Sequence, residues 1–119
     1  MTQWIFNTPD KSPAFMLAKA GYDVWMGNSR GTRFSEGHMV YDHLVDMQYW
    51  NHTWEEMGTY DSPAVIDFIL NTTGYDNLSY IGHSQGVTQI LAGASLKPDY
   101  FKEKLNLAIF LAPPGTLYY

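Results

Sequence analysis

LSYIGHSQGVTQILAGASL, residues 78–96, joins an apolar strand pattern, a glycine-flanked serine and a helix pattern rich in small residues. Leu78 to Ile81 predict a short strand, and Val87 to Leu96 predict a helix. Between them, Gly82-His83-Ser84-Gln85-Gly86 has the spacing of a nucleophile elbow, a turn from strand to helix within a few residues. Glycine is needed on both flanks because neighbouring side chains would collide. We therefore expect Ser84 in a strained conformation, with its hydroxyl clear of the sheet.

This turn supplies the candidate catalytic groups. Ser84 is the candidate nucleophile, and the backbone N–H of Gln85 is a candidate donor to the oxyanion that forms on an attacked carbonyl. His83 is adjacent to Ser84, and neighbours at a sharp turn point apart, so we expect a packed or hydrogen-bonded histidine rather than the base. The bare pentapeptide pattern arises by chance in roughly one such chain in ten, so its strand and helix context carries the prediction.

The flanking sequence extends the same alternation of helices and strands. Ser12-Pro13 and Ser62-Pro63 each predict a helix opening, with serine as the cap and proline at the first position. Residues 22–26 and 107–111 predict two further strands. Strands that alternate with helices predict the α/β class, a parallel sheet with crossover helices on both faces. The strand at 107–111 is nearly all apolar, so we expect it to be buried on both faces.

Residues 32–60 carry weaker signals. A rough helical spacing of apolar residues runs through Val40, Leu44 and Met47. Four nearby side chains could suggest metal ligands, but no matching ligand set occurs elsewhere, and a solvated polar face is the favoured interpretation: His38, Asp42, His43 and Asp46. We expect Glu55 and Glu56 to be a surface pair, because adjacent carboxylates on a helix face different directions.

Composition narrows the class of protein. The chain has 119 residues, 45% of them apolar and 16% aromatic, which is typical of one small globular domain. A formal charge of −5 argues against nucleic acid or anionic lipid as the main partner. There is no cysteine, so disulfides and thiol catalysis are excluded. The longest uncharged stretch, 77–96, contains polar residues and predicts no membrane span. Residues 1–10 have no basic residue ahead of an apolar run, so they predict no signal peptide.

Four blocks of the chain resemble the acid lipases, the lysosomal and gastric lipase family of α/β-hydrolases. They are AKAGYDVWMGNSRG at 18–31, WEEMGTYDSPAVIDFI at 54–69, the elbow at 82–86 and Leu111-Ala112-Pro113. The resemblance implies hydrolysis of neutral lipid esters, such as acylglycerols or sterol esters, without a metal or organic cofactor. It implies that Ser84 forms an acyl-enzyme and that Gln85 contributes its N–H.

Asn28, Ser29 and Arg30 match the family pattern, but no chemical step follows for them, and we expect a structural loop. The chain departs from the family in its catalytic partners. The hydrolase triad runs serine, acid, histidine, yet all four histidines lie at or before position 83. Asp99 and Glu103 follow the serine too closely to be the family acid.

We therefore expect residues 1–119 to be a partial lipase-like domain that lacks the upstream oxyanion strand and the downstream acid, histidine and lid. In the family fold the absent strand lies between those predicted at 22–26 and 78–81, and such a gap would reduce stability. We expect the chain alone to be inactive on esters. One alternative is a non-catalytic pseudoenzyme or interaction module that retains the scaffold. Another, an unrelated serine hydrolase such as a thioesterase, is disfavoured by the blocks at 28–31 and 54–64.

Three Asn-X-Ser/Thr sequons begin at Asn51, Asn71 and Asn77, although the chain has few asparagines. About one would occur by chance, so the excess suggests a glycoprotein. Together with the resemblance, the sequons predict that the full-length parent is secreted or lysosomal.

Overall fold

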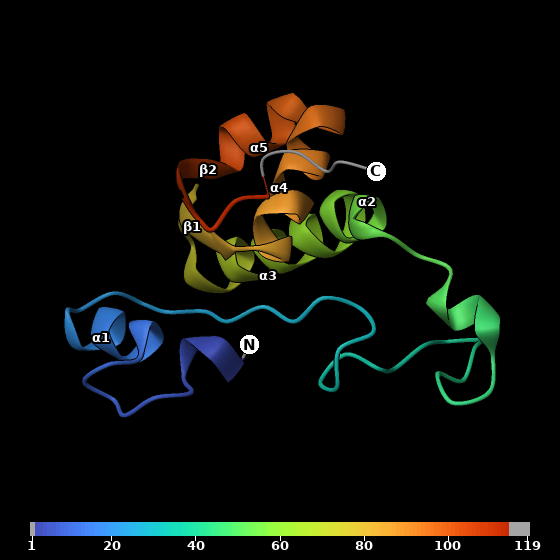
Figure 1. The fold of residues 1–119 in the computed structure, drawn as a ribbon. Coiled ribbons are helices and arrows are strands. Elements are labelled where there is room, and N and C mark those ends of the chain that lie inside the picture. The colour runs from blue at the N-terminus through green and yellow to red at the C-terminus, as the bar shows by residue number, and fades with distance from the viewer. Residues whose placement is uncertain (1, 115–119) are drawn as a thin grey trace.

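The computed structural model describes residues 2–114 and contains a two-stranded parallel sheet (Figure 1). Strand β1 (Leu78–His83) pairs with β2 (Leu105–Leu111), and Gly82 lies opposite Phe110. The chain passes from β1 to β2 through α4 (Gln85–Leu96) and α5 (Pro98–Lys104), as parallel strands require. The predicted α/β class and the strand, helix and strand at 78–111 are confirmed. No helix within residues 2–114 is both long and apolar enough to cross a membrane.

One long helical run crosses behind the sheet. It consists of α2 (Trp54–Glu56), the π-helical turn η3 (Met57–Asp61) and α3 (Ser62–Thr73). Thr53 and Glu56 form a capping box at its start, and Gly74 ends it in the left-handed conformation, with φ 77°. The helix predicted to open at Ser62-Pro63 is present as α3, with Pro63 in its first turn. It continues directly from α2 and η3, however, so Ser62 has helical backbone angles (φ −61°, ψ −47°) instead of acting as the predicted cap.

The helical run accommodates Pro63 through the π-helical turn and a lysine from another element. Proline has no N–H, so it cannot donate to the carbonyl of Thr59 four residues earlier. The ammonium of Lys97, at the junction of α4 and α5, donates to that oxygen over 2.7 Å. Ser62 Oγ donates to the carbonyl of Met57 (3.1 Å). The carbonyl freed by the proline is thus satisfied from outside the regular helical ladder, whereas the carbonyl of Met57 also accepts the backbone N–H of Ser62.

The core lies where α3, α4 and α5 meet. Ile66, Leu70, Ile90 and Phe101 form one buried cluster. Beside it, η3 and α4 approach too closely for side chains at the crossing. A β-carbon on Gly58 would lie 2.7 Å from the backbone nitrogen of Gly93, and one on Gly93 would lie 2.8 Å from the Phe101 ring. Two glycines, one from each helix, therefore set the spacing of this packing.

Residues 22–26 do not form the predicted strand. They follow α1 (Pro13–Lys19) in an extended conformation but pair with no strand among residues 2–114. The segment instead lies against α3, where Trp25 meets Phe68 edge-on at 5.9 Å between ring centroids. The physical reason is that a strand needs a hydrogen-bonded neighbour, and the described residues provide none beside this segment.

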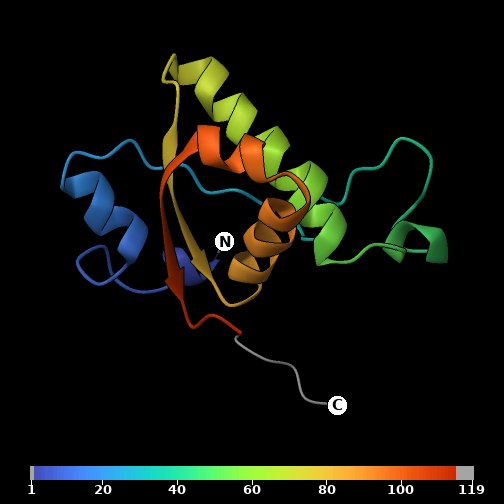
Figure 2. The same cartoon turned by 90° about the horizontal axis from the view of Figure 1, so that it is seen from above.

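The expected burial of residues 107–111 on both faces is also wrong. Leu107 is 52% exposed and Phe110 is 36% exposed. In Figure 2, α3, α4 and α5 lie on one side of the two strands, and α1 lies on the other. With only β1 as a neighbour, β2 remains largely uncovered.

Residues 38–52 project to one end of the molecule, as both cartoon views show. The helical spacing of Val40, Leu44 and Met47 does not produce a helix across them. Only η2 (Met47–Trp50) is helical, and all three apolar side chains are at least three-quarters exposed. The spacing fails because no other element lies opposite these residues to bury an apolar face. At α1, Ser12 does not cap the helix through its side chain; it is fully buried and donates to the carbonyl of Asn7.

Candidate active site

Ser84 occupies the turn between β1 and α4 with φ 51° and ψ −115°. This region of φ is unfavourable for a residue with a side chain and costs on the order of 1–3 kcal/mol. Two backbone hydrogen bonds hold the turn: the N–H of Ser84 donates to the carbonyl of Leu111 (3.0 Å), and the N–H of Val87 donates to the carbonyl of Ser84 (2.9 Å). The side chain of Ser84 is exposed. The strained strand-to-helix turn predicted from the sequence is therefore present.

Close packing leaves little room for side chains at the glycines beside Ser84, and less at Gly82 than at Gly86. A β-carbon on Gly82 would lie 2.7 Å from Cε1 of Tyr80 and 3.1 Å from backbone atoms of Gly86 and Val87. One on Gly86 would lie 3.2 Å from the Tyr80 hydroxyl. Any side chain at Gly82 would have to displace the start of α4.

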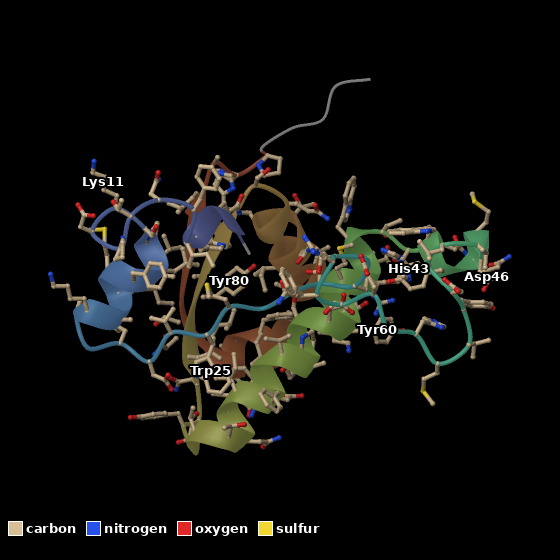
Figure 3. All side chains as sticks on the ribbon, turned by 90° about the horizontal axis from the view of Figure 1, so that it is seen from below. Lys11, Trp25, His43, Asp46, Tyr60 and Tyr80 are labelled. Atoms are coloured by element: carbon tan, nitrogen blue, oxygen red, sulfur yellow. The ribbon has the colours of Figure 1, made fainter. Side chains whose placement is uncertain are left out.

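Tyr80 ties the two ends of this turn together. Its hydroxyl donates to the carbonyl of Gly86 over 2.9 Å, and burial raises its pKa to about 12. Figure 3 shows the side chain of Tyr80 between β1 and the helices. The sequence analysis did not predict this contact. Tyr80 lies two residues before Gly82 and therefore on the same face of the strand, so its position could have indicated that it packs against the turn.

Gln85 is the first residue of α4, where backbone N–H groups have no partner within the helix. Within residues 2–114, the N–H of Gln85 has no acceptor, so it is available to an oxyanion beside Ser84. The side chain of Gln85 points elsewhere and donates to the sulfur of Met57 (3.4 Å). Its role as an oxyanion donor remains a prediction.

The loop Asn28-Ser29-Arg30 connects the helices that support this turn. Ser29 Oγ donates to Oε1 of Gln89 (3.1 Å), whose Nε2 donates to the same Met57 sulfur (3.0 Å). The guanidinium of Arg30 donates twice to Oδ1 of Asp61, from Nε (2.8 Å) and Nη2 (2.6 Å), and its backbone N–H donates to Oδ2 (2.9 Å). The hydrogen bond with Asp61 raises the pKa of Arg30. These contacts fit the structural role expected for the loop.

Among the described residues, no side chain of the four histidines makes a hydrogen bond with Ser84. His38 Nδ1 accepts the N–H groups of Val40 and Tyr41, and His52 Nδ1 lies 3.1 Å from the carbonyl of Tyr49. His43 lies 3.5 Å from the carboxylate of Glu36 (Figure 3 labels His43). His83 is exposed and has no hydrogen-bond partner within residues 2–114, so the packed or hydrogen-bonded histidine expected there is not present.

The carboxylates near His38 and His43 form turns. Asp42 Oδ1 accepts the N–H of Leu44 (2.8 Å), and Asp46 Oδ2 accepts the N–H of Asp42 (2.7 Å). Across the described part of the chain, no group of three or more His, Asp or Glu side chains is arranged to hold a metal ion. Glu55 is exposed, and Glu56 serves the helix cap, where hydrogen bonds from Thr53 lower its pKa.

Two open cavities border these elements. The larger, about 380 Å³, is apolar and lies between the extended segment with Trp25 and Gly27 and the side of α3 with Val65 and Phe68. The smaller, about 170 Å³, is lined by Gln3, Trp4, Pro13, His83 and Leu111. Only the smaller one borders the elbow, through His83.

The chain resembles known lipases over almost its entire length. It is 45% identical to lipase member K of Mus musculus over 116 residues and 44% identical to gastric triacylglycerol lipase of Bos taurus over 118 residues. These alignments cover 98% and 99% of the chain but only 29% of each lipase, so the chain spans about three tenths of the length of the curated relatives it matches. A sequence profile of the alpha/beta hydrolase fold matches residues 13–114. The chain therefore belongs to the α/β-hydrolase fold family.

Proposed function

We propose that this chain is the nucleophile-bearing part of a serine hydrolase that cleaves the esters of neutral lipids. The observation that carries the proposal is the backbone of Ser84, with φ 51° at the junction of β1 and α4. A strained serine at a strand-to-helix turn is the arrangement in which a nucleophile elbow exposes its hydroxyl, and the N–H of Gln85 follows at the start of α4, where an oxyanion donor is expected.

In the proposed reaction, Ser84 Oγ attacks the ester carbonyl carbon while its proton passes to a general base. The C=O bond becomes an oxyanion, which accepts a hydrogen bond from the N–H of Gln85. Collapse of this intermediate breaks the bond to the alcohol, which takes the proton from the base, and leaves an acyl-enzyme. Water then attacks the acyl-enzyme by the same route and releases the fatty acid.

The general base is proposed to come from outside these 119 residues. His38, His43 and His52 are held by contacts among residues 36–52, and within residues 2–114 none of them makes a hydrogen bond with Ser84. The relatives that the chain matches extend well beyond the aligned part. We infer that a histidine, an acid, a second oxyanion donor and a lid are contributed by such further segments.

The substrate class rests on the relatives. The gastric lipases of Bos taurus and Homo sapiens are named for triacylglycerol, and they are 44% and 43% identical to this chain. We propose acylglycerols or sterol esters as substrates, with no cofactor. A secreted or lysosomal parent protein is part of the same proposal.

The test compares these 119 residues with a longer natural chain that includes them. Each is exposed to a serine-directed fluorophosphonate probe and to a short-chain ester, alongside its Ser84→Ala variant. We expect the longer chain to label and turn over, and Ser84→Ala to abolish both. The 119 residues alone are expected to lie several powers of ten below it, because a serine hydroxyl without a base is a poor nucleophile.

Two results would contradict this proposal in different ways. Turnover by the 119 residues that Ser84→Ala removes would reveal a base within them, with His38, His43 and His52 the next positions to replace. A longer chain that neither labels nor hydrolyses esters would favour a non-catalytic interaction module that retains the scaffold.

A further inference from the structure

We infer that Met57 is a positioning residue for the oxyanion donor, because its buried sulfur holds the side chain of Gln85 away from the backbone N–H that Gln85 offers to the substrate. This inference rests on the proposed function, in which Ser84 attacks an ester and Gln85 donates that N–H. Met57 is the first residue of η3, on a different helical element from the elbow. Its contact with Gln85 can be measured without any enzymatic activity.

Two side-chain amides converge on the Met57 sulfur. Gln85 Nε2 donates to Sδ over 3.4 Å, and Gln89 Nε2 donates to it over 3.0 Å. The two glutamines are four residues apart in α4, so their side chains share one face of that helix. Figure 1 shows α4 next to the helical run that contains η3, and these two elements are in contact. The sulfur thus anchors both amides at the point where α4 begins.

The amide of Gln89 is oriented from its other side by Ser29. Ser29 Oγ donates to Gln89 Oε1 over 3.1 Å and links positions 60 residues apart. An amide has its oxygen on one side and its NH₂ group on the other, so an oxygen held by Ser29 leaves the NH₂ group facing the sulfur. Gln89 is 9% exposed and Met57 is 8% exposed, which leaves little room for water to replace either partner. Ser29 therefore supports the sulfur contact indirectly.

The side chain of Gln85 needs a fixed position because it can compete with the substrate. Gln85 is exposed, and within residues 2–114 its amide makes no hydrogen bond except the one to Met57. The backbone N–H groups of Gln85 and Gly86 have no acceptor among the described residues, since both lie in the first turn of α4. The amide oxygen is an acceptor, as a carbonyl oxyanion is. A released amide can fold back onto these N–H groups and take the place of the oxyanion.

Leucine is the substitution that separates the acceptor at Met57 from its packing. Leu and Met are similar in volume, and exchanges between them are well tolerated in protein cores. The side chain of leucine has no atom that accepts an N–H group, so Met57→Leu removes both hydrogen bonds at once. The backbone carbonyl of Met57, which accepts Ser62 Oγ, stays in place.

The first measurement detects the contact by NMR, in the longer natural chain used to test the proposed function. Methionine methyl groups are labelled with ¹³C, and the Met57 resonance is assigned by its loss in Met57→Leu. Gln85→Ala is expected to shift this resonance, and Ser29→Ala is expected to shift it through Gln89. Thr32→Ala is the matched control, because its hydroxyl lies in the same loop but donates to the backbone carbonyl of Ser29 (2.8 Å). It should leave the resonance where it is.

The second measurement is the kinetics of ester hydrolysis by the same chain. Met57→Leu should lower kcat by about 10-fold and leave KM unchanged, because an oxyanion forms only in the transition state. Met47→Leu is the control for the exchange itself, since Met47 is 84% exposed, and it should change neither constant. In a Gln85→Ala background, which keeps the backbone N–H but has no amide to fold back, Met57→Leu should lower kcat by less than about 2-fold.

A Met57 resonance that does not move in Gln85→Ala would overturn the inference. So would an equal loss of kcat on Met57→Leu in both backgrounds, because a purely structural role of Met57 does not depend on the side chain at position 85. An inactive longer chain that shows the methyl shift would contradict the proposed function and support the sulfur contact. An active longer chain without the shift would contradict this inference alone.

Discussion

Replacing Gly58 with alanine tests the close crossing of η3 and α4. The added β-carbon would lie 2.7 Å from the backbone nitrogen of Gly93 and still closer to the carbonyl oxygen of Gln89. Because both are backbone atoms, no change of rotamer can relieve the collision, and α4 must move. Overpacking of this kind costs about 1–3 kcal/mol. The better helix propensity of alanine returns up to about 1 kcal/mol. We therefore expect a net loss of about 1–2 kcal/mol in the free energy of unfolding.

The assay is urea denaturation followed by tryptophan fluorescence, since Trp54 lies in the first turn of the same helical run. With a slope of about 1–3 kcal/mol per molar urea, the midpoint should fall by roughly 0.5–1 M. Gly37→Ala is the control, because a β-carbon there meets nothing within 4 Å, and its effect should stay within about 0.5 kcal/mol. A Gly58→Ala protein as stable as the original would refute the close approach of the two helices.

Two further predictions concern Tyr80 and Arg30. The pKa of Tyr80 is raised to about 12 from an ordinary value of 10, so the folded state holds this proton more tightly, and stability should fall as pH rises from 10 toward 12. Tyr80→Phe should remove that pH dependence from the unfolding midpoint and cost about 1 kcal/mol near pH 7; a midpoint with the same pH dependence in the variant would contradict it. Arg30→Lys should cost about 0.5–1 kcal/mol, because the pair with Asp61 is partly exposed but uses two donors of one guanidinium. A double-mutant cycle with Asp61→Asn checks this by urea denaturation, and strictly additive effects would show that the two side chains are not coupled.

The parts of the fold that could be predicted from the sequence are those determined by residues close together in the chain. Gly74 supplies the left-handed residue that ends α3, and the glycines around Ser84 permit a turn that few other residues could adopt. Ser84 could be predicted as the candidate nucleophile because the five consecutive residues of the elbow pattern are enough to indicate such a turn.

The parts that were not predicted depend on partners distant in the chain. The segment 22–26 has the composition of a strand, but no described strand lies beside it to form hydrogen bonds. The sequence of the segment itself cannot indicate whether such a partner strand is present. The link between Arg30 and Asp61 spans 31 residues and arises only when the loop packs on the helix. The true start of the helical run was readable, because Thr53 and Glu56 have the spacing of a capping box. Ser62-Pro63 marks the start of α3 within that run, and the π-helical turn η3 joins α3 to α2.

Lys97 donates the hydrogen bond that Pro63 cannot supply, so the helical run at 54–73 depends on the α4–α5 junction. Without Lys97, the carbonyl of Thr59 loses a donor, and the helix is weakest at its centre rather than at its ends. The run from Trp54 to Thr73 is therefore not an autonomous folding unit. We expect a synthetic peptide of these residues to break near Pro63 and to become one helix only as the α4–α5 junction docks, so that secondary and tertiary structure form together in a single cooperative step.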